Sequence, residues 1–452
     1  MLLALFLFAF IAISFFNHPA IDDYWSANEI VNHGRLGAVK HLYETVSGRY
    51  FSNFLMSVCN TLPEGNVWIF KVWPALTIIL LWLAFFYFFK SLFKEFAKPM
   101  ELILASLAFV AVHISNMRSL FEGLYWMSSA IIYQIAIISF LVGIAAIRAY
   151  WRKPSFHTAG LALFFSAVLP GTSELLTPIY LLALLLILLI AIKENLTKYL
   201  ILSCIVVVST GMVITLTSEG NHHRINDDAL NYSQSISFAV GYSFLTVSYY
   251  FLFWIVNILN FSGFLLLLPF LKRISIRVAN VLKELRPLDN IFLFTAFALS
   301  VCMCVYIPLY YIESRLPFPR VTTMLFFIGV FLFCIFICSL LYKSGFVLRL
   351  TKRLLSVKNF NLYSWILFLI ALFSSRNFLA VSADLVNGTA YQYNQEYFGR
   401  YEEIRKCKSD TCYVTPFKHW LPSIQLSQAE IRNDGSFNHM DKFFGKTITY
   451  KK

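Results

Sequence analysis

The residues best suited to chemistry begin with an acidic pair, Asp22-Asp23, just beyond the first apolar stretch of the chain. Two adjacent carboxyl groups in apolar surroundings repel each other, so one of them should have a raised pKa and can serve as a general base. Pro19 before the pair and Tyr24-Trp25 after it are expected to fix this turn at a membrane interface. The alternative is a solvated acidic turn that only marks topology.

Arginines in several loops can hold a phosphate, because a guanidinium group forms paired hydrogen bonds to phosphate oxygens. Arg49, in the segment 48–51, is the first, and its alternative role is to snorkel toward lipid headgroups. Arg224 follows Gly220-Asn221, whose backbone also favours an anion, so Asn221 and Arg224 form a second candidate. The others stand at ends of apolar stretches, where pairing with acidic residues is the plainer interpretation: Arg315, Arg320 and Arg376.

Aromatic and acidic residues between apolar stretches can hold a sugar. Tyr125 and Trp126, preceded by Glu122 and followed by two serines and by Tyr133, can stack on a sugar ring and bond to its hydroxyls. The alternative is an aromatic belt at the membrane interface. Glu174 interrupts an apolar block within the segment 171–174, and an ionisable group at membrane depth is usually functional. A plain turn between two helices is the alternative for Glu174.

The sequence favours no metal site and no nucleotide site. His222 and His223 are adjacent and point in different directions on most backbones, and neither has a partner at metal-ligand spacing. Because Asp22-Asp23 is the only carboxylate-rich cluster near the candidate residues, we favour no metal and no cofactor there, with a divalent metal ion as the alternative. The chain has no P-loop, no GxSxG, no HExxH and no dinucleotide fingerprint.

The composition places these residues in a membrane protein. Of 452 residues, 58% are hydrophobic, 17% aromatic and only 13% charged, against about 25% charged in soluble domains. The net charge of +13 comes from basic residues in short loops rather than from one basic face, so we expect no nucleic-acid partner. The predicted fold is an all-α polytopic membrane protein embedded in a lipid bilayer.

Apolar stretches of about 20 residues are needed to cross a bilayer, and the sequence predicts about eleven transmembrane helices. They cover residues 2–16, 67–89, 101–116, 129–147, 158–171, 175–192, 199–217, 245–271, 291–311, 321–341 and 361–379. The first is short enough for a cleaved signal peptide to be its alternative. The block 158–192 can also be a single broken hairpin. Merging two spans would move the C-terminus to the other side.

Alternate loops differ sharply in charge. Most basic residues fall in loops 90–98, 148–153, 193–198, 272–286 and 343–358, which the positive-inside rule places in the cytoplasm. The N-terminus is then cytoplasmic and the C-terminus lies outside. The predicted domains are a transmembrane domain, 1–380, whose first outer loop, 17–66, carries a surface helix over 26–47, and an external segment, 381–452. Cys407 and Cys412 can form a disulfide if that segment is outside the cytoplasm, but the sequence does not decide whether they do.

The order of these motifs resembles the GT-C superfamily of integral-membrane glycosyltransferases over about residues 1–380. Asp-Asp in the first outer loop is followed by a surface helix and Gly-Arg-Tyr-Phe. Tyr-Trp-x-Ser-Ser, Ser-Glu and Gly-Asn-x-x-Arg then come in turn, with an arginine near an outer span end. The chain is most similar to a bacterial branch near the O-antigen glucosyltransferases. It departs from that branch at Glu219, where the branch has proline, which changes the local charge.

The resemblance implies transfer of a sugar from a polyprenyl-phosphate donor to a cell-envelope glycan or glycolipid acceptor. The reaction would take place on the periplasmic face of a bacterial inner membrane. An acidic residue of the first outer loop would be the base, here Asp22 or Asp23. Matching positions are Arg49, Tyr125, Trp126, Glu174, Asn221 and Arg224. The alternative is a lipid-linked glycan polymerase or a transporter (flippase), although the late outer loops are short and no inverted repeat is visible. A structural membrane subunit is a further alternative.

Overall fold

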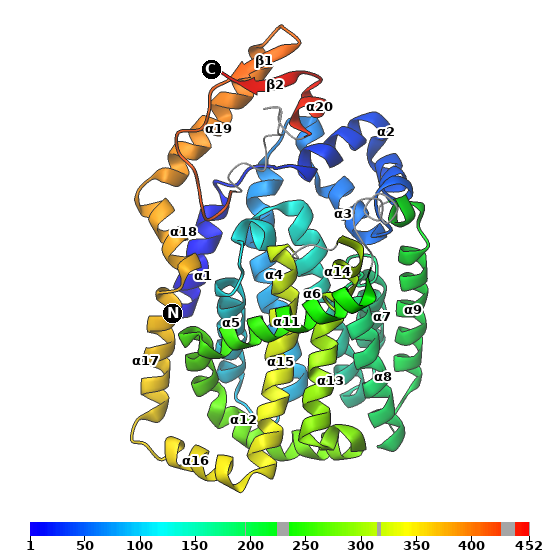
Figure 1. Cartoon of the computed structure of the whole chain (residues 1–452), viewed down its shortest axis with the longest axis vertical. Helices are drawn as coiled ribbons and strands as arrows, with labels where there is room; N and C mark the ends of the chain where they lie inside the picture. Colours follow the sequence, from blue (N-terminus) through cyan, green and yellow to red (C-terminus); the bar gives the residue numbers. More distant parts are fainter. Residues whose placement is uncertain (195, 224–234, 314–317, 426–438, 452) are drawn as a thin grey trace.

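The chain folds into a bundle of helices (Figure 1) in a computed structural model that describes all residues except 195, 224–234, 314–317, 426–438 and 452. The long bundle helices are α4 (Trp68–Phe93), α5 (Pro99–Ser115), α6 (Met127–Arg152), α8 (Thr177–Lys193), α9 (Tyr199–Leu216), α11 (Ile236–Val256), α12 (Ile258–Glu284) and α15 (Pro319–Lys343). The shorter ones are α1 (Leu2–Ser14), α7 (Phe156–Val168), α13 (Ile291–Met303), α14 (Ile307–Glu313), α16 (Gly345–Leu355) and α17 (Phe360–Phe373). The all-helical prediction is confirmed, apart from one small sheet.

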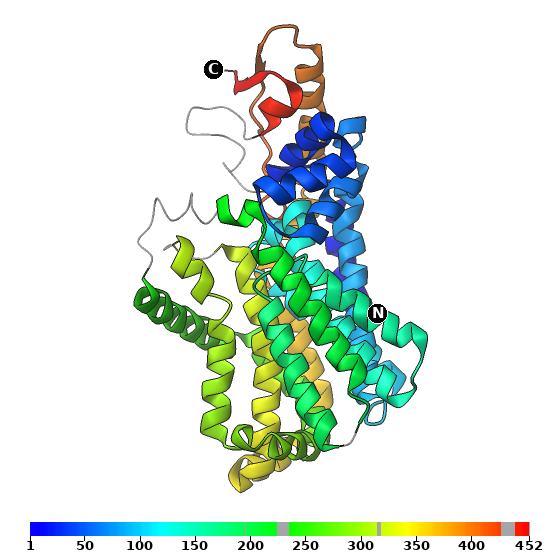
Figure 2. The ribbon, with the colours of Figure 1, turned by 90° about the vertical axis from the view of Figure 1, so that its right-hand side faces the viewer.

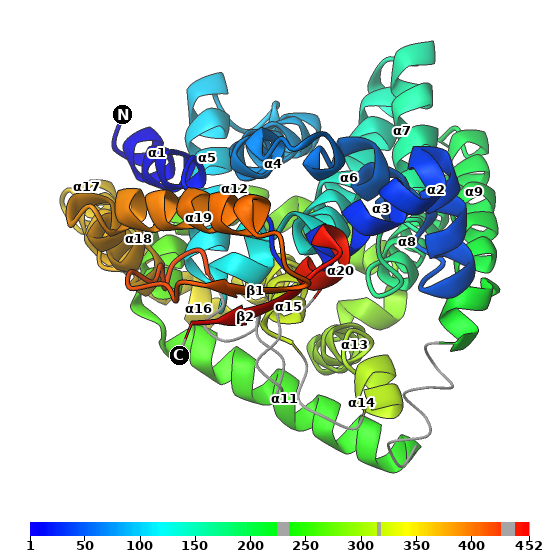
Figure 3. The same cartoon turned by 90° about the horizontal axis from the view of Figure 1, so that it is seen from above.

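The two ends of the bundle carry different elements (Figures 1 and 2). At one end, here called the α2 end, lie α2 (Asp22–Thr45), α3 (Tyr50–Cys59), η1 (Leu62–Glu64) and η2 (Phe121–Tyr125). At the other, the α16 end, lie α16 and η3 (Arg286–Asp289). Basic side chains at the α16 end form ion pairs such as Arg152–Glu95 and Lys343–Asp289. The helices that run between the two ends separate the α2 end from the basic α16 end, whereas α11 lies across them (Figure 3).

Five helices are long and apolar enough to cross a membrane, namely α4, α6, α9, α11 and α15. A sixth candidate is the pair α16 and α17, which are bent by 89° at the break between them. Other apolar helices, among them α1 and α13 with 13 residues each, are shorter. A helix of 13 residues rises only about 20 Å, against about 30 Å of bilayer core. The chain is thus a multi-pass membrane protein by its helices.

Two predicted spans are wrong in their boundaries. The apolar run 245–271 is not one helix, because α11 ends at Val256 and α12 begins at Ile258. Asn257 makes the break by accepting hydrogen bonds from the backbone N–H groups of Leu259 and Asn260, as an N-cap does. The run 291–311 likewise divides into α13 and α14. A single asparagine in an apolar run is too weak a signal for a hydropathy window to detect.

A proline in α4 explains how the chain fixes the loop after α1. Pro74 has no N–H group, so the carbonyl oxygen of Phe70 loses its helical partner. The side-chain amide of Asn17 donates to that oxygen at 2.9 Å and to the carbonyl oxygen of Tyr125 at 2.7 Å. One buried amide thus joins the segment before α2 to both α4 and η2. In a membrane protein such backbone groups must find partners within the protein.

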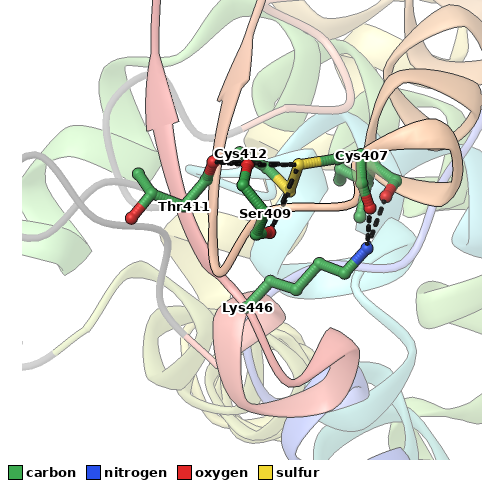
Figure 4. Close-up of a disulfide and its surroundings, with 6 residues drawn as sticks. Cys407, Ser409, Thr411, Cys412 and Lys446 are labelled. Atoms are coloured by element: carbon green, nitrogen blue, oxygen red, sulfur yellow. Dashed lines mark hydrogen bonds between the residues drawn. A yellow bond between two sulfur atoms is a disulfide. The ribbon is translucent and has the colours of Figure 1, made fainter.

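The C-terminal segment covers part of the α2 end (Figure 3). It consists of α18 (Arg376–Val386), α19 (Thr389–Lys406), β1 (Thr411–Val414), α20 (Met440–Phe444) and β2 (Thr447–Tyr450), with β1 and β2 parallel. A disulfide joins Cys407 to Cys412 beside Lys446 (Figure 4), a pairing that the sequence allowed without deciding. Apolar residues of this segment belong to the same core cluster as α1, α4 and α6. The cap is therefore packed against the bundle.

Candidate functional site

The acidic pair opens α2, and its two members have different surroundings. Asp23 is fully buried and accepts hydrogen bonds from the backbone N–H of Ala20 at 3.0 Å and from Ser128. The Ser128 hydroxyl donates at 2.6 Å and its backbone N–H at 3.2 Å, both to Oδ1. Burial raises the pKa of Asp23 to about 7, although the bonds from Ser128 and Ala20 oppose the shift. Asp23 joins the start of α2 to the start of α6.

Asp22 faces a different direction, since consecutive residues of a helix are about 100° apart. It makes no hydrogen bond within the described part of the chain. Burial raises the pKa of Asp22, and the nearby guanidinium groups of Arg320 and Arg49 oppose that shift. A partly buried carboxylate near two cations and without a hydrogen-bond partner is available to accept a proton from a ligand.

The backbone just before the pair is strained. Ile21, the N-cap of α2, has φ of 42° and ψ of −104°. A positive φ is unfavourable for a β-branched residue and costs on the order of 1–3 kcal/mol. The bonds around Asp23 offset that cost and hold the turn. The strain sits directly beside the carboxylate that has no partner, where a fixed geometry matters most.

Arg49 is placed by a loop that interlocks with two other segments. The backbone N–H of Gly48 donates to Oδ1 of Asn221 at 3.2 Å, and the Asn221 amide donates to the carbonyl oxygen of Thr215 at 2.7 Å. A Cβ at Gly48 would collide with that same carbonyl oxygen, so only glycine fits there. Asn221 therefore positions the loop that carries Arg49. Its role as a direct anion ligand stays a prediction.

An ion pair joins Arg49 to Glu174. Nε of Arg49 lies 2.7 Å from Oε2 of Glu174, and the two side chains are 17% and 20% exposed. The pair forms because the backbone N–H groups of Phe51 and Ser52, at the start of α3, donate to the carbonyl oxygen of Gly171. The Nη groups of Arg49 make no hydrogen bond within the described residues. They are available for a phosphate, while the bond to Glu174 fixes the orientation of the guanidinium group.

Arg320, at the start of α15, lies against a wall of aromatic rings. Its Cζ atom is 5.2 Å from the ring centre of Trp126, 5.9 Å from that of Tyr133 and 4.4 Å from that of Phe318. Such contacts hold a guanidinium group in a fixed plane. Arg320 is also electrostatically coupled to Glu122, whose pKa is raised by burial and lowered in part by Arg320.

Three polar atoms of this wall lack a hydrogen-bond partner among the described residues: Nε of Arg320, Nε1 of Trp126 and Oε2 of Glu122. Each is buried, and a buried polar atom without a partner costs about 1–3 kcal/mol. Buried polar atoms without a partner are rare in native proteins, so each one needs a physical explanation. Two donors and one acceptor thus gather around Arg320, which is electrostatically coupled to Asp22, and a polar ligand could satisfy them.

The structure sorts the predicted residues into two sets. Contacts or electrostatic coupling connect Asp22, Arg49, Glu122, Trp126, Tyr133, Glu174 and Arg320 to one another at the α2 end, and we call these seven residues the Asp22 cluster. Residues from five separate segments thus meet: α2, the loop before α3, η2 with α6, the turn between α7 and α8, and α15. A hollow lined by Leu189, Glu284 and Phe297 lies elsewhere, at the α16 end, and carries none of this chemistry.

The remaining predicted residues lie apart from the Asp22 cluster. The hydroxyl of Tyr125 donates to the carbonyl oxygen of Phe10 in the core, so this ring is turned away from the Asp22 cluster, and its expected sugar contact stays a prediction. The one-turn π-helix η2, which ends at Tyr125, turns this ring inward and leaves Trp126 at the site. Arg376 is exposed at the start of α18, which packs on α1 and α5. Arg224 and Arg315 lie outside the described residues.

Sequence reasoning missed the residues that hold the acidic turn in place. Besides Ser128, the amide of Asn60 donates to the carbonyl oxygen of Asp23 and to the hydroxyl of Ser26, both at 2.7 Å. Lys71, buried at the start of α4, donates to Asn394 of the cap and to the carbonyl oxygen of Phe15. A lysine within a predicted apolar span could have marked Lys71 as a residue with a buried polar partner.

Comparison with protein families, with characterised proteins and with solved structures finds no match to this chain. The class of protein that the fold defines is therefore a multi-pass helical membrane protein with a polar cluster at one end of its bundle. Anything narrower must be argued from the Asp22 cluster itself.

Proposed function

We propose that the chain is a membrane glycosyltransferase of the GT-C type. It would transfer a sugar from a polyprenyl-phosphate donor to a cell-envelope glycan or glycolipid. The observation that carries the proposal is the Asp22 carboxylate, which is partly buried, has no hydrogen-bond partner among the described residues and lies near Arg49 and Arg320. A base beside two phosphate-binding groups is what transfer from a phosphate-linked donor requires.

The proposed reaction is a single displacement with inversion. Asp22 accepts the proton of the acceptor hydroxyl as its oxygen forms a bond to the anomeric carbon. The bond between that carbon and the donor phosphate oxygen breaks, and the polyprenyl phosphate leaves with the electron pair. Arg49 and Arg320 stabilise the negative charge that develops on the leaving oxygen. The proton on Asp22 then passes to solvent.

Other residues of the Asp22 cluster would position the sugar of the substrate. The rings of Trp126 and Tyr133 lie beside Arg320, where a sugar ring can stack on an aromatic face. The unpartnered Nε1 of Trp126 and Oε2 of Glu122 can bond to sugar hydroxyls. Correct orientation supplies much of the rate of such a transfer, because it replaces an encounter in solution by a fixed geometry.

The proposed topology places the α2 end in the periplasm and the α16 end in the cytoplasm of a bacterial inner membrane. About eleven crossings, counting the shorter apolar helices, keep the basic loops together on one side. The disulfide between Cys407 and Cys412 belongs to the α2 end, and disulfides persist in oxidising compartments. Both arguments support the same orientation, with a lipid donor reaching the site from the outer leaflet.

The test uses the full-length protein in detergent with a radiolabelled polyprenyl-phosphate hexose and crude cell-envelope glycan. Label should move from lipid to glycan with the wild-type protein and with Asp410→Asn, which changes an exposed carboxylate in the cap. It should not move with Asp22→Asn. Binding of lipid-linked glycan without any transfer by the wild type would instead favour a polymerase or a transporter.

A further inference from the structure

A second group of ligating side chains lies on α2, apart from the Asp22 cluster. It consists of Glu29, His33 and His41, whose candidate ligand atoms all lie within 4.8 Å of one another. Glu29 follows Asp22 by seven residues, which is about 10 Å along a helix. The candidate base is therefore near this group but is not part of it.

A kink in α2 creates the group. Glu29 and His33 are one helical turn apart and share a face. His41 would lie far along a straight helix, but Gly34 leaves the helical conformation with φ of 70° and ψ of 168°, and the second half of α2 folds back. The two imidazole rings then meet, with centroids 4.4 Å apart and planes at 28°. A side chain at position 34 would be strained at that φ.

The distances fit a shared ion better than they fit hydrogen bonds. Nε2 of His33 lies 3.5 Å, and Nε2 of His41 3.4 Å, from the same oxygen, Oε2 of Glu29. Good hydrogen bonds of this kind are about 2.7–3.2 Å long. Zinc bonds of about 2.0–2.2 Å in a tetrahedral arrangement separate neighbouring ligand atoms by about 3.4 Å. Only the two histidine nitrogens would need to move closer together.

The chemistry of the donors selects the class of ion. Two imidazoles and one carboxylate suit zinc and neighbouring divalent transition metals, whereas magnesium and calcium prefer oxygen ligands alone. The side chain of Glu29 is only 12% exposed, while those of His33 and His41 are 42% and 38% exposed. The site is thus open to ions from solution, and three protein ligands leave a fourth position for water.

We propose that Glu29, His33 and His41 form a binding site for a divalent transition-metal ion of the zinc type. The ion would hold the two halves of α2 together across the Gly34 kink. Because the first half of α2 begins at Asp22, the ion would also stiffen the helix that carries this residue. The proposal does not depend on the function proposed above.

The experiment measures zinc binding to the full-length protein in detergent, purified without a histidine tag. Wild type should bind one zinc ion per chain by titration calorimetry, and zinc should raise its thermal unfolding temperature. His33→Gln/His41→Gln removes two of the three ligands and should weaken binding by more than the about 10- to 100-fold that loss of an outer-shell partner costs. His222→Gln/His223→Gln, which removes two other exposed histidines, should bind as the wild type does.

Two readouts keep the test independent of folding. Glu29→Gln keeps the shape of the side chain, so it should unfold at the metal-free wild-type temperature and still lose zinc. Cobalt added to the wild type should give the strong visible absorption of a tetrahedral site, and Glu29→Gln should lack it. The proposal is overturned if the wild type binds no zinc, or if the double histidine variant retains it.

Discussion

Asp22 and Asp23 are adjacent, yet their replacement by asparagine should affect different properties: transfer activity for Asp22 and stability of the fold for Asp23. Asp22 makes no hydrogen bond within the described residues, so Asp22→Asn should change the free energy of unfolding by no more than about 0.5 kcal/mol. Transfer should fall about 10²- to 10⁴-fold, the usual contribution of a general base, which corresponds to about 2.7–5.5 kcal/mol of activation free energy.

Asp23→Asn should instead weaken the fold. An asparagine keeps one acceptor oxygen, which can serve Ser128, but its Nδ2 group then faces the backbone N–H of Ala20. Two buried donors remain without acceptors, at about 1–3 kcal/mol each, or about 2–6 kcal/mol together. Any loss of transfer should follow the loss of folded protein.

The assay pairs two measurements on each variant. Thermal unfolding in detergent, followed by tryptophan fluorescence, reports stability, and initial rates of label transfer per folded molecule report activity. Asp410→Asn serves as the common control. The reasoning is refuted if Asp23→Asn abolishes transfer at unchanged stability while Asp22→Asn transfers normally.

Three further predictions concern the surroundings of this pair. Arg320→Gln removes a positive charge that lowers the pKa of Asp22, so that pKa should rise. Because the base must be ionised to act, the acid limb of the kcat/KM profile should move to higher pH. An unmoved limb would contradict the coupling between Arg320 and Asp22. Glu174→Gln leaves a partly buried guanidinium group without its carboxylate, so unfolding in detergent should be easier by about 1–3 kcal/mol, and an unchanged stability would show that the pair is not formed. Alkylation of the unreduced, denatured protein should leave Cys407 and Cys412 unlabelled in a mass spectrum, whereas labelling of both would remove the disulfide argument for an external cap.

Much of the site could be predicted from residue types and sidedness. The acidic pair, Arg49, Glu174 and Arg320 all meet at one end, because loops at alternate ends of apolar helices are neighbours in any up-and-down bundle. The sequence could not predict which carboxylate of the pair is already occupied by hydrogen bonds within the protein. That depends on Ser128, more than a hundred residues away, which occupies the oxygens of Asp23.

Local backbone geometry accounts for what the sequence did not predict. The π-helical turn η2 turns Tyr125 into the core and leaves Trp126 at the site, although the two residues look equivalent in sequence. Asn257 divides an apolar run in two by capping a helix. Gly34 brings His41 back to Glu29, and no spacing rule for a straight helix connects these two residues. The helical class was predicted because composition alone determines it, and the span count stays a prediction.

The most direct test of the account measures donor binding and transfer in the same sample. Purified full-length protein is incubated with radiolabelled polyprenyl-phosphate hexose and glycan, and lipid-bound and glycan-bound label are separated. The account predicts that Asp22→Asn binds the donor as tightly as the wild type does and transfers almost no label. Equal transfer by the two proteins, or loss of donor binding in Asp22→Asn, would contradict the claim that Asp22 is the base of a glycosyltransferase.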